Sequence, residues 1–356
     1  MQANSENKHQ IVVVLGTGGT IAGIATEGAG GASGDISYTA AQLGVDVLLQ
    51  GLPGPAMDRV GLQPEQVAQL DSKDMGFGVW QALALRVAHH LARPAVTGIV
   101  ITHGTDTLEE TAYFLHRVLP PALLRAKPVV ITCAMRPATS AEADGPKNLA
   151  DAIHLAVEPG AYGVLAVCAG QIHCAVHVQK VHPFRLDAFD SGDSGPLGRM
   201  NGQQVLMAKA WPLPEASQAN ARDELVLDSM PYWPRVEIVL SHAGANGRLV
   251  DALLAGPLQP ARERLMGIVV AGTGNGSVHR DLEMALLRAQ QAGIRVWRAT
   301  RCAYGAVQAV AAHGLPETTG LSPVKARIEL ALALLAGDAT LSSGPSGPGD
   351  QTVSLA

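Results

Sequence analysis

The segment IVVVLGTGGT, residues 11–20, joins a run of five apolar residues to a glycine-rich turn that ends in threonine. Such a run is typical of a buried strand that ends in a tight turn. Similar apolar runs occur at residues 98–102, 128–132 and 163–167, and the apolar spacing at residues 79–91 predicts a helix. This alternation predicts an α/β fold in which a parallel sheet carries helices on both faces.

Proline-rich sequence at residues 212–234 interrupts the alternation and predicts a linker. We therefore expect a large N-terminal α/β domain at residues 1–211 and a smaller α/β domain at residues 235–342. The tail at residues 343–356 is expected to be disordered, because it offers little apolar surface to bury. In the smaller domain, strands are expected at 235–240, 266–271 and 294–299, with helices at 278–292 and, after an N-cap at Ser322, at 323–336.

Composition excludes several classes of function. The formal charge is −5 and no basic stretch occurs, which argues against a nucleic-acid partner. No apolar run reaches the length of a membrane span, and the first eight residues carry no apolar signal segment. We expect a cytoplasmic protein, or a periplasmic one if a signal peptide was removed.

The cysteines form no CxxC pair and are expected to be buried, reduced thiols: Cys133, Cys168, Cys174 and Cys302.

Three separated segments combine hydroxyl or acidic side chains with the end of a strand-like run. They are residues 16–23, which include Thr20, residues 71–75 and residues 102–107. Ligands of open parallel sheets bind at the carboxyl ends of the strands, so these segments are expected to meet. Two threonine hydroxyls, a serine, an aspartate and free backbone amides around one pocket suit the cleavage of a small, polar, charged amide.

The local motifs also allow other interpretations. The turn at residues 16–23 could bind a nucleotide or be purely structural, although it lacks both the GxGxxG and the Walker spacing. The glycine-rich residues 23–34 could form a lid over substrate or a disordered connector. Thr107, with Glu110 three residues later, predicts a capping box. Thr105 and Asp106 with a distant lysine form a plausible nucleophile and base, while Asp106 could also act only as a helix cap.

Histidines offer weaker candidates. His103 could suggest a hydrolase base, but no GxSxG motif accompanies it. His173 and His177 could bind a metal if they lay on a helix, but no acidic third ligand has a suitable spacing. The sequence therefore predicts neither a metal site nor a cofactor.

The motifs together resemble the bacterial-type L-asparaginases, including the glutaminase-asparaginases, over about residues 11–336. The matching segments are residues 18–23, 71–75, 103–112, 134–137, 143–149, 195–198 and 272–276. The resemblance implies a large N-terminal α/β domain and a smaller, flavodoxin-like C-terminal domain. It also implies hydrolysis of L-asparagine to L-aspartate and ammonia without metal or cofactor, weaker action on glutamine, and a homotetramer built from close dimers.

The resemblance assigns the catalytic residues as well. Thr20 matches the nucleophile that forms an acyl-enzyme, and Tyr38 matches the lid tyrosine paired with it. Thr105, Asp106 and Lys180 match a second catalytic set. How the two threonines divide the work remains open at this point.

Substrate-binding residues follow from the same resemblance. Ser72 and Asp106 match the residues that hold the α-carboxylate and the α-ammonium of the substrate, and Asn275 matches a residue near that ammonium. Lys73 departs from the family pattern of Gln or Glu, and could either bind the carboxylate or point to solvent.

A second departure concerns the loop at residues 302–315, which contains no acidic residue. Periplasmic-type members place there a glutamate that completes the neighbouring subunit's site, and Glu317 is a poor substitute.

Two alternatives to an asparaginase stay open. One is the amidotransferase-subunit type of amidase, for which an additional N-terminal domain is expected although only about ten residues precede the first strand. The other is a non-catalytic amino-acid sensor on the same fold.

Overall fold

The computed structural model describes residues 10–26, 38–52, 60–212, 232–255, 263–308, 314–316, 318 and 320–337. The chain divides into two compact units, Met1–Ser229 and Met230–Ala356. Most of the predicted linker and all of the predicted disordered tail lie outside the described residues, as do residues 27–34 of the predicted lid.

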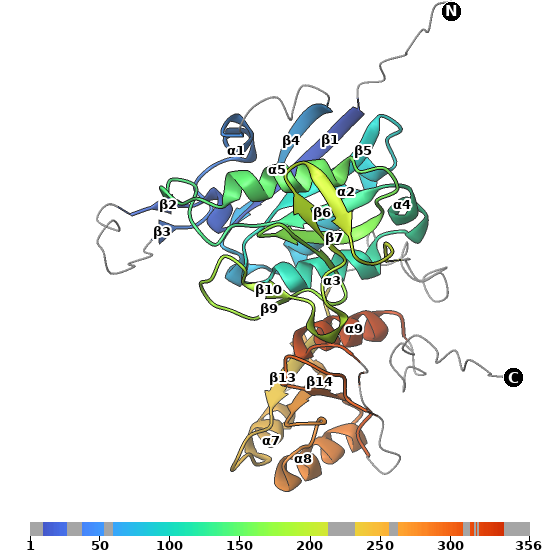
Figure 1. Cartoon of the computed structure of the whole chain (residues 1–356). Coiled ribbons are helices and arrows are strands. Elements are labelled where there is room, and N and C mark those ends of the chain that lie inside the picture. The colour runs from blue at the N-terminus through green and yellow to red at the C-terminus, as the bar shows by residue number, and fades with distance from the viewer. Residues whose placement is uncertain are drawn as a thin grey trace, which may run out of the picture. The chain divides into compact units, whose positions relative to one another are not determined.

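The described part of the N-terminal unit is built on an eight-stranded sheet with the order β12-β11-β8-β7-β6-β5-β1-β4 (Figure 1). Neighbouring strands from β4 to β7 run parallel, whereas β8, β11 and β12 run antiparallel. The strands are β1 Gln10–Gly18, β4 Val60–Leu70, β5 Val96–Thr102, β6 Pro128–Thr132, β7 Gly163–Cys168, β8 Gln171–Cys174, β11 Gly198–Asn201 and β12 Gln204–Met207.

The predicted α/β fold with a parallel sheet is thus confirmed, and an antiparallel edge that the sequence did not predict extends the sheet beyond β7. Cys168 pairs with Gln171, so only Ala169 and Gly170 join β7 to β8. A two-residue connection can form only an antiparallel hairpin, because a parallel crossover needs about a dozen residues or more. Both turn residues have a positive φ, 47° at Ala169 and 75° at Gly170, as a twisted two-residue hairpin requires.

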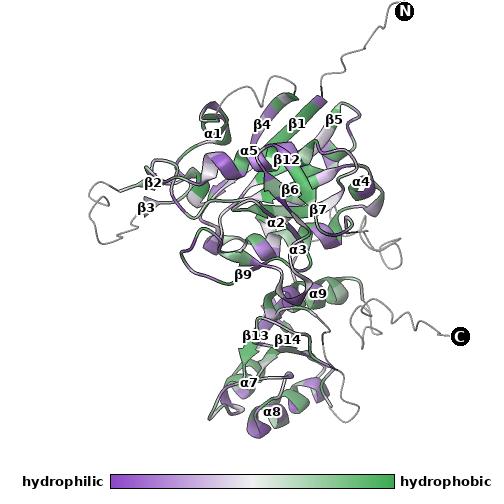
Figure 2. Cartoon of the chain, in the orientation of Figure 1, coloured by the Kyte–Doolittle hydropathy of each residue, from purple (hydrophilic) through white to green (hydrophobic). Residues whose placement is uncertain are grey.

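Helices cover both faces of this sheet. On one face, α1 and α5 share a buried cluster with alternate residues of the central strands, such as Val12, Val14 and Val130. On the other face, α2 and α3 pack together through the stacked rings of Trp80 and Phe114, with centroids 5.0 Å apart. Figure 2 shows the hydrophobic central strands between these layers. The helices are α1 Val45–Gln50, α2 Phe77–Leu91, α3 Leu108–Val118, α4 Pro121–Ala126 and α5 Gly145–Ala156.

Short elements carry residues of the predicted site. Strands β2 (Ile24–Ala25) and β3 (Tyr38–Thr39) form one antiparallel ribbon, and β9 (Gln179–Lys180) and β10 (Phe189–Asp190) form another. The 3₁₀ turns are η1 Thr20–Ala22, η3 Ser72–Asp74 and η4 Gly192–Ser194.

The predicted capping box at Thr107 is wrong. Thr107 stands at the N-cap of α3 but makes no side-chain cap. Its hydroxyl donates instead to the carbonyl of Ser72, with an O–O distance of 2.8 Å. The Thr107 hydroxyl therefore makes a tertiary contact with Ser72 and does not cap its own helix. Ser322 likewise precedes α9 (Pro323–Leu335) without capping it through its side chain.

The C-terminal unit contains a parallel three-stranded sheet in its described part, with the order β13-β14-β15. Helices α7 and α8 share a buried cluster with residues such as Val239 and Val270. Helix α9 packs closely on the sheet, since a Cβ at Gly267 would lie 2.9 Å from Leu330 Cδ2. The unit is therefore a small α/β sandwich, built from β13 Arg235–Leu240, α7 Arg248–Leu254, β14 Leu265–Gly272, α8 Arg280–Gln291 and β15 Arg295–Thr300.

The prediction that all four cysteines are buried fails at one position. Cys133, Cys168 and Cys174 are buried, but Cys302 is exposed because it lies in a surface turn after β15.

None of the described helices combines the length and apolar character that a membrane crossing requires.

Candidate active site

The two predicted threonines lie next to each other because their strands are neighbours. Strands β1 and β5 are paired, with Gly16 opposite Thr102. Beyond the strand ends, Gly19 contacts Gly104 so closely that a Cβ at Gly19 would lie 2.3 Å from Gly104 Cα. Thr20 and Thr105 directly follow these two glycines. Only glycines permit this backbone approach, which brings both hydroxyl-bearing residues to one place.

Ser72 joins the same place from the end of β4. A Cβ at Gly104 would lie 2.4 Å from Ser72 Oγ, and the backbone N–H of Asp106 donates to Ser72 Oγ at 3.2 Å. Ser72 is buried, with 2% of its surface exposed. Its oxygen accepts from Asp106, so its own proton is left to donate to another group. The three segments singled out in the sequence therefore meet.

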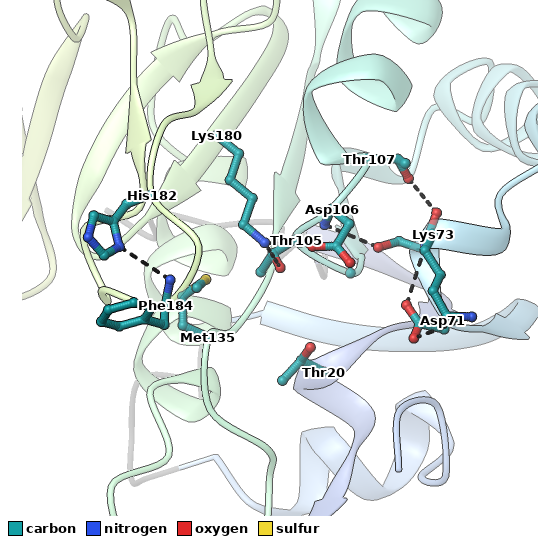
Figure 3. Close-up of polar contacts among 12 residues, drawn as sticks. Thr20, Asp71, Lys73, Thr105, Asp106, Thr107, Met135, Lys180, His182 and Phe184 are labelled. Atoms are coloured by element: carbon teal, nitrogen blue, oxygen red, sulfur yellow. Dashed lines mark hydrogen bonds and ion pairs between the residues drawn. The ribbon is translucent and has the colours of Figure 1, made fainter. Parts of the chain in front are cut away.

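Thr20 has a neutral partner. Its Oγ1 lies 2.7 Å from Tyr38 Oη, and either oxygen can donate. Tyr38 reaches this position from β3, where it pairs with Ala25 of β2. Figure 3 shows the Thr20 hydroxyl pointing toward the loop that carries Thr105 and Asp106. The predicted pair of threonine and tyrosine is thus assembled in the structure.

Thr105 has a charged partner. Lys180 Nζ donates to Thr105 Oγ1 at 2.8 Å and to Asp106 Oδ1 at 2.6 Å (Figure 3). The Lys180 side chain is 16% exposed, whereas that of Asp106 is 52% exposed. Because Thr105 accepts from an ammonium group, its own proton is free to be donated into the site.

His103 is not placed to act as a base. It is fully buried, its Nδ1 lies 2.7 Å from the Gly104 carbonyl, and its Nε2 lies 2.9 Å from Thr111 Oγ1. The carbonyl can only accept, so Nδ1 carries the proton and Nε2 accepts from Thr111. Burial lowers the pKa of His103 from 6.5 to about 4, which keeps the ring neutral near pH 7.

Two residues behind His103 had no role in the sequence analysis. Trp80 Nε1 donates to Thr111 Oγ1 at 2.8 Å, which completes a buried chain of hydrogen bonds from α2 through α3 to Gly104. The chain holds the backbone immediately before Thr105. Trp80 and Thr111 are 31 positions apart, so no local pattern could have linked them.

Lys73 is exposed, with 60% of its side chain accessible, and forms an ion pair with Asp74 and a longer one of 3.9 Å with Asp71. The hydrogen bond to Asp74 raises the pKa of Lys73 above 10.5. Its ammonium is therefore already balanced by two carboxylates. A role in binding the substrate carboxylate remains a prediction.

His173 and His177 do not share a helix. His173 lies in β8 and its Nδ1 bonds Ser191 Oγ at 2.9 Å, while His177 lies in the following turn. The helical spacing that a shared metal would need is thus missing here. Among the described residues, no group of three or more His, Cys, Asp or Glu side chains is arranged to hold a metal ion.

Asn275 belongs to the C-terminal unit and follows β14. Its Oδ1 accepts from Gln308 N at 2.7 Å, and its Nδ2 donates to Gln308 O at 3.3 Å. The buried Arg298 donates from Nη1 to the Asn275 carbonyl at 2.9 Å. The side chain thus holds the loop after β15, and its role toward substrate stays a prediction. Glu317 lies outside the described residues.

Comparison with known families matches both units. The family described as "Asparaginase, N-terminal" matches residues 11–212, and the one described as "Glutaminase/Asparaginase C-terminal domain" matches residues 235–341.

Individual relatives agree over nearly the whole chain. L-asparaginase 2 of Bacillus subtilis (strain 168) is 34% identical over 327 residues, which cover 90% of this chain and 81% of the relative. A glutaminase-asparaginase of Pseudomonas fluorescens biotype A is 33% identical over 342 residues, 94% of this chain and 88% of that protein. The crystal structure of a probable cytoplasmic L-asparaginase from Campylobacter jejuni matches with a TM-score of 0.78 and 34% identity, covering 91% of this chain and 95% of that one.

Proposed function

Because this chain belongs to the asparaginase family, we propose that it is an L-asparagine amidohydrolase, which converts L-asparagine to L-aspartate and ammonia. The observation that carries the proposal is the direct contact of Gly19 with Gly104, which sets Thr20 and Thr105 beside one another. Each threonine has its own hydrogen-bond partner, Tyr38 for Thr20 and Lys180 for Thr105. Two hydroxyls with separate partners suit a reaction that needs both a nucleophile and a proton donor.

Substrate binding uses both ends of the amino acid. The Ser72 hydroxyl, whose proton is free to donate, binds the α-carboxylate. The Asp106 carboxylate keeps one oxygen beyond the Lys180 contact and binds the α-ammonium. Holding both charged groups fixes the side-chain amide near the threonines, and such positioning lowers the barrier.

In the first chemical step, Thr20 Oγ attacks the carboxamide carbon, and its proton passes to Tyr38 Oη, 2.7 Å away, as the phenol releases its own proton to water. The carbon–nitrogen bond then breaks, and the Thr105 hydroxyl donates a proton to the leaving nitrogen, so that ammonia departs. The Lys180 ammonium passes a proton to Thr105 Oγ1 as that hydroxyl donates its own, and Lys180 regains a proton from water. In the second step, water hydrolyses the acyl ester on Thr20 and releases aspartate.

The assignment is tested by ammonia release from L-asparagine, L-glutamine and D-asparagine over a concentration series. An acyl-enzyme trapped by rapid acid quench is expected on the peptide that contains Thr20. Its appearance on the Thr105 peptide would reverse the two roles. Binding of asparagine without any ammonia would instead support a sensor on the same fold.

Finer properties follow from the same proposal. Glutamine is expected to be a weaker substrate, in line with the glutaminase-asparaginase among the relatives. A homotetramer built from close dimers is expected, which light scattering after size exclusion would test. A cytoplasmic location agrees with the name of the Campylobacter jejuni neighbour, and cell fractionation would test it.

A further inference from the structure

Residues 134–139, here called the bridging segment, follow β6 and lie between the two halves of the site. Its first four residues, 134–137, belong to a sequence motif for which neither the sequence nor the proposed chemistry supplies a role. Ala134 packs in a small buried cluster with Ile21 and Ala22, which belong to the turn that begins at Thr20. The segment is therefore in contact with the surroundings of the proposed nucleophile.

Asp144 fixes the path of the bridging segment. Its Oδ2 accepts from Met135 N at 3.0 Å and its Oδ1 accepts from Arg136 N at 2.9 Å. Asn148 Nδ2 donates both to Asp144 Oδ2 at 3.1 Å and to Cys133 O at 3.0 Å. Hydrogen bonds to a carboxylate are stronger than those between neutral groups, so this anchor holds the segment firmly.

One end of the bridging segment holds the ribbon that carries Tyr38. Ala138 N donates to Gly23 O at 3.0 Å, and Ala25 N donates to Thr139 Oγ1 at 2.8 Å. Ala25 is paired directly with Tyr38. A ribbon of two residues per strand is too short to be stable alone, so outside contacts such as these decide where Tyr38 lies.

The other side of the bridging segment holds the hairpin that carries Lys180. Arg136 Nη1 donates to Phe184 O at 3.0 Å. Phe184 lies in the loop between β9 and β10, and Phe184 N donates to His182 Nδ1 at 3.2 Å within the same loop (Figure 3). Lys180 is paired with Phe189 in this hairpin, again with two residues per strand.

We propose that the bridging segment positions both catalytic halves, with Arg136 acting through Lys180 and Thr139 acting through Tyr38. The proposal rests on the asparaginase function stated above. Neither Arg136 nor Thr139 is assigned a contact with the reacting atoms, so both are positioning residues. Each contact reaches a different ribbon, and therefore the two side chains should affect different catalytic partners.

The first experiment compares Arg136→Ala with Arg185→Ala. Arg185 lies in the same hairpin loop, but its guanidinium bonds only Asp187 nearby, at 2.8 and 3.0 Å, in the described contacts. We expect Arg136→Ala to lower kcat about tenfold or more while KM changes less than about threefold, because misplacement of a catalytic group acts mainly on turnover. Arg185→Ala should stay within about twofold of wild type, and Arg136→Lys should recover part of the loss.

The second comparison is Thr139→Val with Ser140→Ala. Thr139→Val removes the acceptor for Ala25 at nearly constant shape, whereas the Ser140 hydroxyl, among the described residues, accepts only from Glu142 N within its own turn, at 3.3 Å. The Thr139 contact is exposed, so we expect a smaller fall in kcat, about three- to tenfold. Ser140→Ala should leave kcat unchanged.

Double variants separate positioning from general damage. Arg136→Ala should cost nothing further in a Lys180→Met background but its full effect in Tyr38→Phe, and Thr139→Val should show the reverse pattern. Equal losses in both backgrounds, or wild-type kcat for Arg136→Ala, would overturn the inference. Circular dichroism checks folding, and Arg136→Gln replaces Arg136→Ala if that variant fails to fold. A wild-type protein without ammonia release would instead refute the proposed function itself.

Discussion

Thr105 and Thr20 lie at the ends of neighbouring strands, yet different kinds of partner hold them. Thr105 bonds an ammonium group that is itself paired with Asp106, and its loop is held from behind by the buried His103. Thr20 bonds the neutral phenol of Tyr38, which lies on a two-residue strand. One half of the site is therefore charged and anchored in the core, and the other is neutral and anchored near the surface.

This difference suggests a division of labour. The charged half keeps its geometry without substrate, because the ion pair and the buried network reinforce each other. The neutral half depends on one hydroxyl pair and on a two-residue ribbon that hydrogen bonds from Ala138 and to Thr139 hold in place, so its geometry is more easily changed. A proton donor benefits from a fixed electrostatic setting, whereas a nucleophile must move toward its target. The comparison thus favours Thr105 as donor and Thr20 as nucleophile.

The largest expected effect is loss of either hydroxyl. Thr20→Ala and Thr105→Ala should each lower kcat by about 10³-fold or more, because each removes a group that takes part in bond making or proton transfer. Coupled detection of ammonia measures the rates. Thr39→Ala, an exposed hydroxyl beside Tyr38, is the matched control and should keep wild-type turnover. Near-normal ammonia release from Thr20→Ala would break the proposed division between the halves.

Loss of the hydrogen-bond partner of either threonine should lower kcat less than loss of the threonine itself, and the two partners should differ in the size of this effect. Lys180→Met should lower kcat about 10²-fold or more, since it removes the charge that supports Thr105 and leaves Asp106 unpaired. Tyr38→Phe should cost less, about tenfold, because water can accept the Thr20 proton in its place. Lys147→Met removes an exposed lysine paired with Asp151 and serves as the control. A larger loss for Tyr38→Phe than for Lys180→Met would reverse the comparison.

Much of this architecture was readable in the sequence. The strand predicted at residues 98–102 is confirmed within β5, and the helix predicted at residues 79–91 is confirmed within α2. These segments are buried and regular, so their apolar pattern reports their structure directly. The meeting of Thr20 with Thr105 followed from one rule, that carboxyl ends of parallel strands share an edge.

The features that the sequence did not predict depend on contacts between distant segments. Strands β11 and β12 are four-residue pieces at the sheet edge, and their mixed polar and apolar residues give no clear period. The Thr107 hydroxyl bonds Ser72, 35 positions away, instead of capping its own helix. The role of Arg136 depends on Phe184, 48 positions away. No local propensity encodes such partners.

Acid should lower the folding stability through His103, which lies behind the charged half of the site. Its pKa is 6.5 when exposed and about 4 in the fold, so between these pH values the unfolded chain binds a proton that the folded chain does not. Folding stability must therefore fall as the pH is lowered through this window, by about 3 kcal/mol in total, and change no further through this group below pH 4. Urea unfolding at a series of pH values measures the fall.

His103→Asn is the variant for this test. Asn can still donate to Gly104 O, but it does not titrate. The folding stability of the variant should therefore lack the fall that His103 causes between pH 6.5 and 4. The variant should also lose about 2 kcal/mol near neutral pH, because it no longer reaches Thr111. Parallel stability curves for the two proteins would show that His103 does not set the acid sensitivity.

The smallest expected effect is at Lys73, at the rim of the site. The sequence left open whether this lysine binds the substrate carboxylate, but its ammonium is exposed and paired with Asp74. Exposed ion pairs contribute little free energy, so Lys73→Gln should change KM for asparagine by less than about threefold and leave kcat unchanged. Ser72→Ala, which removes the proposed carboxylate donor, should raise KM at least about tenfold under the same conditions. A comparable rise for Lys73→Gln would mean that the lysine leaves Asp74 when substrate binds, and that a charged group also serves the end of the amino acid that Ser72 holds.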